Sequence, residues 1–247
     1  ENFKALSRKG NLIPVFKEID LDYDNPLSIL KKISSKEHCF LLESSDGPEK
    51  WSQYSFLGFD PTFIISSRNN EVRIKKKNES EKKLQKNIFL QLKEIMSEFK
   101  PVKIESLPRF YGGLVGFFSY EVINQIESIA ETKNEKAEFP DSFFMLTDSV
   151  IIFDNINKTA KIVINVHLTN KKKYKASYQN AIKQIADIEK LLKSSKRNLY
   201  KRKSQRSSKK NIIRANFTKP DFLSAVRKIK NYVKNGDVIQ TVVSQRW

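Results

Sequence analysis

Three side chains that can bind the charged ends of a small molecule lie close together where an apolar segment meets a polar turn. Glu43 ends the apolar segment 38–43, Ser44 follows it, and Lys50 stands just after Gly47-Pro48. The carboxylate of Glu43 can bind the ammonium group of a free amino acid, while Ser44 or loop N–H groups can bind its carboxylate. From the residue types alone, an ordinary strand end followed by a turn is the simpler interpretation.

A glycine-rich segment at 111–121 invites comparison with a phosphate-binding loop. Gly112, Gly113 and Gly116 have suggestive spacing, but no Lys-Ser or Lys-Thr pair follows them. These glycines also lie inside an apolar run rather than between a strand and a helix. Glycine in such a run is typical of a strand that packs closely against another backbone. The segment therefore predicts a structural strand.

The remaining candidates for metal binding or acid–base catalysis are few. Glu121, Asp148 and Asp154 could be combined into a carboxylate cluster, but their spacing fits strand ends and a hairpin turn better. His38 and His167 each lie in or beside an apolar segment, without a nucleophile and carboxylate at a recognisable spacing. Packed or exposed histidine is the expectation for both, and no metal site is predicted in this chain.

The charge of the chain is strongly basic but unevenly distributed. The formal net charge is +18, and residues 171–214 hold 16 basic and 2 acidic residues, against 30 and 26 elsewhere. Lysine predominates over arginine, and the only aromatic residues in the run are Tyr174, Tyr178 and Tyr200, which is not the pattern of arginine forks and interleaved aromatics on which nucleic-acid-binding proteins rely. The run therefore predicts a solvated connector between domains. A steeply salt-dependent affinity for DNA or RNA would be evidence for nucleic-acid binding instead.

Other features of the composition restrict the class of protein. Cys39 is the only cysteine, which excludes a disulfide framework and favours a reducing, cytoplasmic location. No apolar run approaches the length of about 18 residues that a membrane span needs. The first residues contain neither a signal-peptide core nor an initiator methionine, so we expect further residues before Glu1. We expect no membrane association.

Residues 1–168 are predicted to form one α+β domain with a mostly antiparallel sheet and flanking helices. Strands outnumber long helices, which argues against a doubly wound parallel sheet. The predicted strands are 38–43, 54–59, 62–67, 71–76, 110–118, 143–153 and 160–168. The predicted helices are 26–33, 88–99 and a short one at about 122–126.

Two further segments follow this domain. Residues 169–215 are predicted to hold an amphipathic helix, with an apolar stripe through Leu192, and then a polar basic linker. Residues 216–247 open with Thr218 as a helix N-cap, continue to Gly236 as a helix stop, and end in a β-prone run, 238–243. A helix and one strand cannot bury their apolar faces alone, so we expect this to be the beginning of a further domain.

The pattern in this last segment resembles a known family. Asn216-Phe217-Thr218, Gly236-Asp237 and Ser244-Gln245-Arg246 match the opening of the chorismate-binding domain in component I of anthranilate synthase. The stretch from Leu41-Leu42-Glu43-Ser44 through Tyr54-Ser55-Phe56-Leu57-Gly58 resembles another segment of the same family. The glycine-rich strand and the segment 139–148 also match, and all these motifs occur in the family's order.

The resemblance implies a regulatory role for the segment that begins at Glu43. The Leu-Leu-Glu-Ser motif lines the allosteric L-tryptophan pocket in that family, so Glu43 and Ser44 are expected to contact the inhibitor. Ser45 and Lys50 are expected neighbours, and the other wall would come from the chorismate-binding domain. Family members usually have Gly-Arg where this chain has Ser52-Gln53. The missing guanidinium group is expected to change a local ion pair.

The resemblance also implies the activity of the large subunit of anthranilate synthase. That enzyme converts chorismate and ammonia into anthranilate and pyruvate, uses Mg²⁺, and receives ammonia from a glutamine amidotransferase subunit in a hetero-oligomer. The family's catalytic and Mg²⁺-binding residues are expected beyond Trp247, so this chain alone is predicted to be inactive. Aminodeoxychorismate synthase component I and a stand-alone amino-acid-binding module are the alternatives. The unpaired run 238–243 argues against the second alternative.

Overall fold

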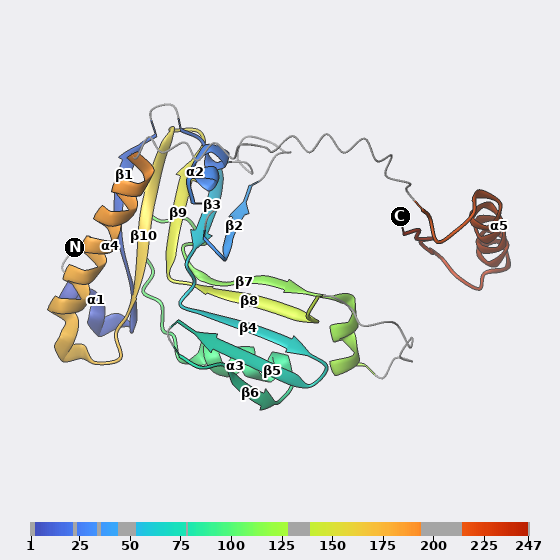
Figure 1. Cartoon of the computed structure of the whole chain (residues 1–247), viewed down its shortest axis with the longest axis horizontal. Coiled ribbons are helices and arrows are strands. Elements are labelled where there is room, and N and C mark those ends of the chain that lie inside the picture. Colours follow the sequence, from blue (N-terminus) through green and yellow to red (C-terminus); the bar gives the residue numbers. More distant parts are fainter. Residues whose placement is uncertain are drawn as a thin grey trace. The chain divides into compact units, whose positions relative to one another are not determined.

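In a computed structural model of the protein, the described residues are 3–21, 24–33, 36–43, 53–77, 79–127, 139–193 and 214–246. The chain divides into two units, residues 1–198 and residues 199–247 (Figure 1). The first unit contains two antiparallel sheets of five strands each. This is the α+β architecture that the sequence predicts.

The first sheet has the strand order β1-β10-β9-β3-β2. Its two central strands are buried along most of their length, because both faces of this sheet are covered. The strands are β1 (Leu12–Asp20), β2 (Cys39–Leu42), β3 (Tyr54–Phe59), β9 (Ser149–Asp154) and β10 (Thr159–His167).

The second sheet has the strand order β6-β5-β4-β8-β7, and its strands run across the direction of the first sheet in Figure 1. The strands are β4 (Phe63–Arg68), β5 (Glu71–Lys76), β6 (Lys82–Gln85), β7 (Gly113–Phe118) and β8 (Ser142–Thr147). The chain passes between the sheets twice, from β3 to β4 through residues 60–62 and from β8 to β9 through Asp148. These two crossings form a corner between the sheets.

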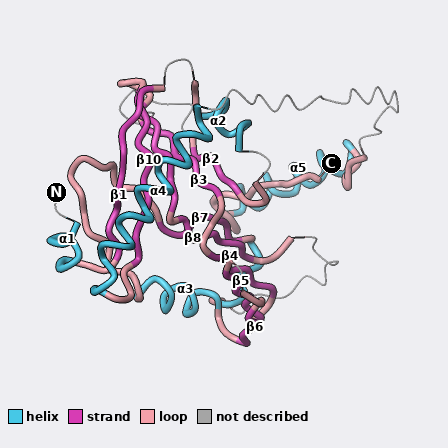
Figure 2. The backbone as a smooth tube through the Cα atoms, turned by 60° about the vertical axis from the view of Figure 1, so that its left-hand side comes forward, coloured by secondary structure: helices cyan, strands magenta, loops and turns pink. Residues whose placement is uncertain are grey.

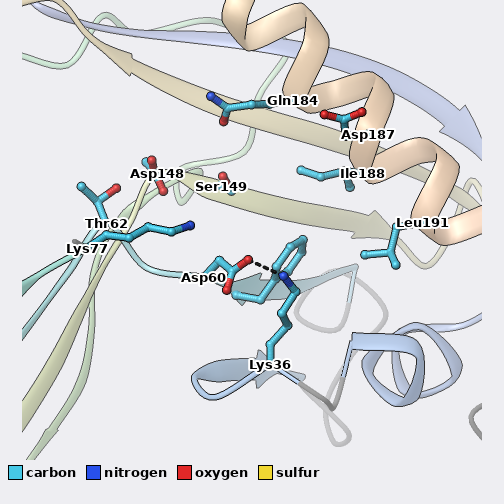
Figure 3. Close-up of a pocket in the computed structure, with 11 residues that line it drawn as sticks. Lys36, Asp60, Thr62, Lys77, Asp148, Ser149, Gln184, Asp187, Ile188 and Leu191 are labelled. Carbon is cyan, nitrogen blue, oxygen red and sulfur yellow. Dashed lines mark hydrogen bonds and ion pairs between the residues drawn. The ribbon is translucent and has the colours of Figure 1, made fainter.

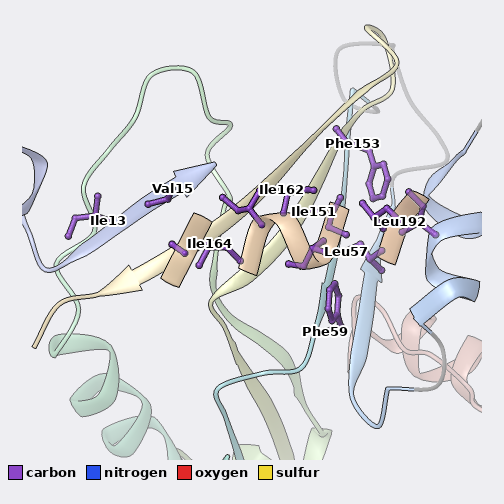
Figure 4. Packing of buried hydrophobic residues seen from close by; sticks show 14 of the residues in the cluster. Ile13, Val15, Leu57, Phe59, Ile151, Phe153, Ile162, Ile164 and Leu192 are labelled. Atoms are coloured by element: carbon purple, nitrogen blue, oxygen red, sulfur yellow. The ribbon is translucent and has the colours of Figure 1, made fainter. Parts of the chain in front are cut away.

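Three helices cover one face of the first sheet: α1 (Phe3–Lys9), α2 (Pro26–Ile33) and α4 (Tyr174–Lys193). Figure 2 shows α4 lying along β1 and β10. The largest apolar cluster lies between these helices and the sheet (Figure 4). Leu57, Phe153 and Ile162 have no exposed surface there, and Ile185 of α4 is 3% exposed. Burial of such side chains stabilises this layer by about 1.5–3 kcal/mol each.

The second sheet has a helix of its own, α3 (Ile88–Ser97), which packs against the face that contains Ile65 and Val72. Asn87 begins this helix because its side chain accepts hydrogen bonds from the backbone N–H groups of Phe89 and Leu90. Two short 3₁₀ helices, η1 (Tyr120–Gln125) and η2 (Lys171–Lys173), complete the described part of the first unit.

The described part of the second unit contains one helix, α5 (Lys219–Asn235). Thr218 caps its first turn by accepting from the N–H of Asp221, and Gly236 ends it with φ +81°, as the sequence predicts. No described residue of this unit pairs with residues 238–243 as a strand, so the strand predicted there stays a prediction. Ile239 is 99% exposed and Val242 is 77% exposed, so apolar side chains of this run are uncovered.

Most other element predictions in the first unit are confirmed, but α1, β1 and β6 were not predicted, and two predicted elements differ from the structure. The predicted strand 143–153 is two strands, β8 and β9, which belong to different sheets and meet at Asp148. The helix expected within 169–215 is α4, and it packs into the core of the first unit rather than standing between two domains. The boundaries predicted after residue 168 and after residue 215, which separate the N-terminal domain, the helix with its linker and the start of a further domain, stay predictions.

Candidate functional site

The predicted ligand-binding segment begins at the end of an edge strand. β2 pairs antiparallel with β3, with Leu42 opposite Phe56, and Glu43 follows as an exposed residue. Gly58 allows the edge strand to lie close, because a Cβ there would come within 2.2 Å of the ring of Phe40. The structure thus places Glu43 at the rim of the first sheet. Ser44, Ser45 and Lys50 lie outside the described residues.

An aromatic surface lies beside this strand end, on the sheet face opposite the helices. Phe56 contacts Phe110 edge to face, with ring centroids 5.2 Å apart, and Tyr54 lies 6.4 Å from Phe56. All three rings are only partly buried and pack against the small cluster that includes Val150. Such a surface can hold a flat apolar group by stacking or edge contacts.

A hydrogen-bond network fixes Tyr54 within this surface. Nε2 of Gln53 donates to the hydroxyl oxygen of Tyr54 at 3.0 Å and to Oδ2 of Asp154 at 3.4 Å. Asp154 is 6% exposed and also accepts from the backbone N–H groups of Ile156 and Asn157. Burial alone would raise the pKa of Asp154, but these hydrogen bonds outweigh it and lower the pKa below its usual value. Gln53 therefore links Tyr54 to the carboxylate of Asp154 without bringing a charge of its own.

A polar cleft of about 410 Å³ lies at the corner between the sheets and is partly lined by α4 (Figure 3). Lys36 and Asp60 form an ion pair across it, with Nζ and Oδ2 2.6 Å apart. Burial raises the pKa of Asp148 above its usual value, although a hydrogen bond with the Thr62 side chain and the charge of Lys77 offset part of this effect. The cleft is lined by charges of both signs, and its charges alone do not indicate the class of ligand.

The remaining sequence candidates have structural roles. Among the described residues, no group of three histidine, cysteine or acidic side chains is arranged to hold a metal ion. The ring of His38 lies 5.8 Å from that of Phe143, and the ring of His167 lies 4.7 Å from that of Phe99. Gly116 lies in β7, where a Cβ would come 1.9 Å from the carbonyl oxygen of Phe143. This close approach explains the glycine without a bound phosphate.

Comparison with known proteins places this architecture in a family. The family model described as "chorismate binding enzyme" matches residues 37–247, most of the chain. The chain belongs to the chorismate-binding enzyme family. Within it, the chain is homologous to anthranilate synthase component 1.

Two relatives and one solved structure show the extent of the match. Anthranilate synthase component 1 of Acetivibrio thermocellus is 32% identical over 249 residues, and that of Aquifex aeolicus is 35% identical over 248 residues. Each alignment covers 100% of this chain and 50% of the relative, so the chain spans about half the length of these curated relatives. The crystal structure of anthranilate synthase component I from Streptococcus pneumoniae TIGR4 matches with a TM-score of 0.56 at 18% identity, covering 89% of this chain and 46% of that one.

The structure adds residues to the candidate site that sequence reasoning did not assign. Phe110 belongs to a loop that lies about 70 positions after Phe40 of β2 in the sequence. Local sequence patterns cannot predict a contact between residues so far apart. The sequence predicts only a hairpin turn at Asp154, because its link through Gln53 to Tyr54 depends on the pairing of β3 with β9. No described helix is long and apolar enough to cross a membrane.

Proposed function

We propose that this chain is the N-terminal part of an anthranilate synthase large subunit. The subunit would convert chorismate and ammonia into anthranilate and pyruvate, with ammonia supplied by a glutamine amidotransferase subunit. The observation that carries the proposal is the match to anthranilate synthase component 1 over the whole chain, at 32% and 35% identity.

The chemical step would take place outside the described residues. Mg²⁺, when bound in this family, would hold the chorismate carboxylate and offset developing negative charge. In the part of the chain that the structure describes, no group of side chains is suited to hold this ion. From the resemblance to the family, we propose that the catalytic and Mg²⁺-binding residues lie beyond Trp247.

Regulation is the part of the function that we assign to this chain. L-Tryptophan would bind at the end of β2, with Glu43 holding its ammonium group and Ser44 its carboxylate, and with Ser45 and Lys50 beside them. The partly exposed rings of Phe56 and Phe110 supply an aromatic surface next to Glu43 that suits an indole. Binding there would favour an arrangement of the complete enzyme that is poor at catalysis.

The activity is tested by product analysis with the complete protein. Chorismate, ammonium and Mg²⁺ are incubated with the purified enzyme, and the products are separated and identified by mass. Anthranilate together with pyruvate supports the proposal. Aminodeoxychorismate without release of pyruvate would instead identify the folate-pathway homologue.

The regulatory assignment is tested separately with Ser44→Phe in the complete protein. The bulky ring should block the inhibitor and leave the uninhibited rate within about twofold of the parent, because the reaction is proposed to take place outside this segment. Identical inhibition curves for variant and parent would remove Ser44 from the site.

A further inference from the structure

Gln53 lies at the same end of the first sheet as Glu43. β2 and β3 pair antiparallel, so Glu43, which follows β2, and Gln53, which precedes β3, reach the same rim of the sheet. In the register that pairs Leu42 with Phe56, the position of Glu43 is beside Ser55, and Gln53 is two residues further along, about 7 Å away. A single amino acid with a large side chain can span this separation.

Both amide hydrogens of Gln53 are used within the protein. Its Nε2 donates to the hydroxyl oxygen of Tyr54 at 3.0 Å and to Oδ2 of Asp154 at 3.4 Å. The amide group cannot be turned around, because Oε1 would then face the carboxylate of Asp154, and two acceptors repel each other. The contacts of Nε2 therefore also fix the direction of Oε1.

The Oε1 atom of Gln53 is an acceptor that the rest of the described chain leaves unused. None of the described residues donates a hydrogen bond to it. It is also not one of the buried unpaired oxygens of the described residues, and Gln53 as a whole is only partly buried. Gln53 thus presents an oriented acceptor that a molecule from outside can reach.

The surroundings of this acceptor limit what binds to it. An amide oxygen only accepts, so its partner must carry an N–H or O–H group. Asp154 has a lowered pKa and is ionised at neutral pH, and its charge opposes an anion beside Gln53. The rings of Tyr54 and Phe56, with centroids 6.4 Å apart, begin the aromatic surface on the same side. A flat ring that carries an N–H group fits this combination.

We propose that Gln53 is a specificity-determining residue, whose Oε1 accepts a hydrogen bond from the indole N–H of L-tryptophan. Asp154 and Tyr54 are positioning residues, because they act only through the amide of Gln53. The indole ring lies against Phe56, and the ammonium group stays at Glu43. This inference rests on the proposed function, and it adds the group that distinguishes an indole from an aromatic ring without an N–H.

Two ligands of nearly the same shape test this hydrogen bond by calorimetric titration of the complete protein. L-Tryptophan carries the indole N–H, whereas 3-benzothienyl-L-alanine has a sulfur atom in its place and keeps the ammonium and carboxylate groups. The parent protein should bind L-tryptophan about fivefold or more tightly, because only L-tryptophan can donate to Oε1 of Gln53. Equal affinities would show that water serves this oxygen and would overturn the inference.

Two variants of Gln53 locate the acceptor. Gln53→Met removes the whole amide at similar length, whereas Gln53→Arg keeps N–H donors for Tyr54 and Asp154 and has no acceptor. In both variants the preference for L-tryptophan over the sulfur analogue should fall at least about threefold relative to the parent. An unchanged preference in both would assign the indole N–H to another group and overturn the inference.

Gln184→Met is the matched control, because Gln184 belongs to α4, which covers the opposite face of the first sheet. This variant should keep the parent's preference. If Gln184→Met loses the preference as well, the effect is not specific to Gln53, which would contradict the inference. The ratio of the two affinities is compared in every variant, so a general loss of affinity does not imitate the predicted result.

Glu43→Ala separates this inference from the proposed function. Both ligands carry the ammonium group, so this variant should weaken both by the same factor and keep the preference for L-tryptophan. If the parent binds neither ligand, the proposed L-tryptophan site is refuted together with the inference. If Glu43→Ala weakens both ligands but the parent shows no preference, only the role of Gln53 is refuted. Thermal unfolding of each variant confirms that it is folded.

Discussion

Glu43 stands at the end of β2, an edge strand, where its carboxylate is exposed to a ligand. If it holds the ammonium group of L-tryptophan, Glu43→Ala in the complete protein should raise the concentration needed for half inhibition by about tenfold or more, since a charge-assisted hydrogen bond is lost. The uninhibited rate should stay close to that of the parent.

A glutamate just before the same strand provides the control for that measurement. Glu37 has a side chain that is 81% exposed, and Glu37→Ala removes the same charge from the other end of β2. Its inhibition curve should match the parent's. If both variants shift inhibition equally, the effect would be a general one of charge, and Glu43 would lose its assigned role.

Ionisation of Asp148 and ionisation of Asp154 should change the free energy of unfolding in opposite directions. The pKa of Asp154 is lowered in the folded state, so its contribution is present above the usual value of 3.8 and is lost as the pH falls through the folded pKa. The pKa of Asp148 is raised, so its ionised form destabilises the fold as the pH rises above 3.8. At about pH 7, Asp154→Asn should lower the free energy of unfolding by roughly 1 kcal/mol, whereas Asp148→Asn should raise it.

Urea unfolding at about pH 7 and about pH 3.5 measures both effects. Each variant should approach the parent at the lower pH, where the carboxyl groups are increasingly protonated in the unfolded state. A pH-independent difference would mean that lost hydrogen bonds, and not ionisation, account for the change in stability.

At the scale of elements, α4 should stabilise the first unit through one face only. Ile185 is 3% exposed and packs on the first sheet, whereas Ile182, on the same helix, is 45% exposed. Ile185→Ala should lower the free energy of unfolding by about 2–4 kcal/mol, because it leaves a cavity in the main cluster. Ile182→Ala should cost less than about 1 kcal/mol. Similar losses for the two variants would contradict the packing of this helix.

The sequence predicts a helix or strand well where neighbouring residues determine its beginning and its end. α5 begins at a capping threonine and ends at a left-handed glycine, and both its ends follow from residues within a few positions. The break between β8 and β9 could not be predicted because the apolar run 143–153 looks continuous, and the transfer of β9 to another sheet depends on its partners β3 and β10.

In the candidate site, too, some residues could be placed from their sequence neighbours, whereas others depend on contacts between distant segments. Glu43 could be placed at a strand end because the apolar run stops there, but the aromatic surface beside it depends on Phe110 from a distant loop.

At the scale of the whole molecule, the chain spans about half of its curated relatives, and the chemistry is assigned to residues outside it. The 247-residue chain on its own should therefore form no anthranilate from chorismate and ammonium, measured by anthranilate fluorescence. The complete protein at the same concentration is the positive control. Measurable turnover by the shorter chain would refute the assignment of catalysis to residues beyond Trp247.

The central claim is that this chain forms the regulatory part of an anthranilate synthase large subunit. The most direct measurement is the initial rate of anthranilate formation by the complete protein, with chorismate, ammonium and Mg²⁺, as L-tryptophan is added. We predict that anthranilate forms and that its rate falls in a saturable manner with L-tryptophan. A rate that does not change with L-tryptophan, or the absence of anthranilate, would contradict the claim.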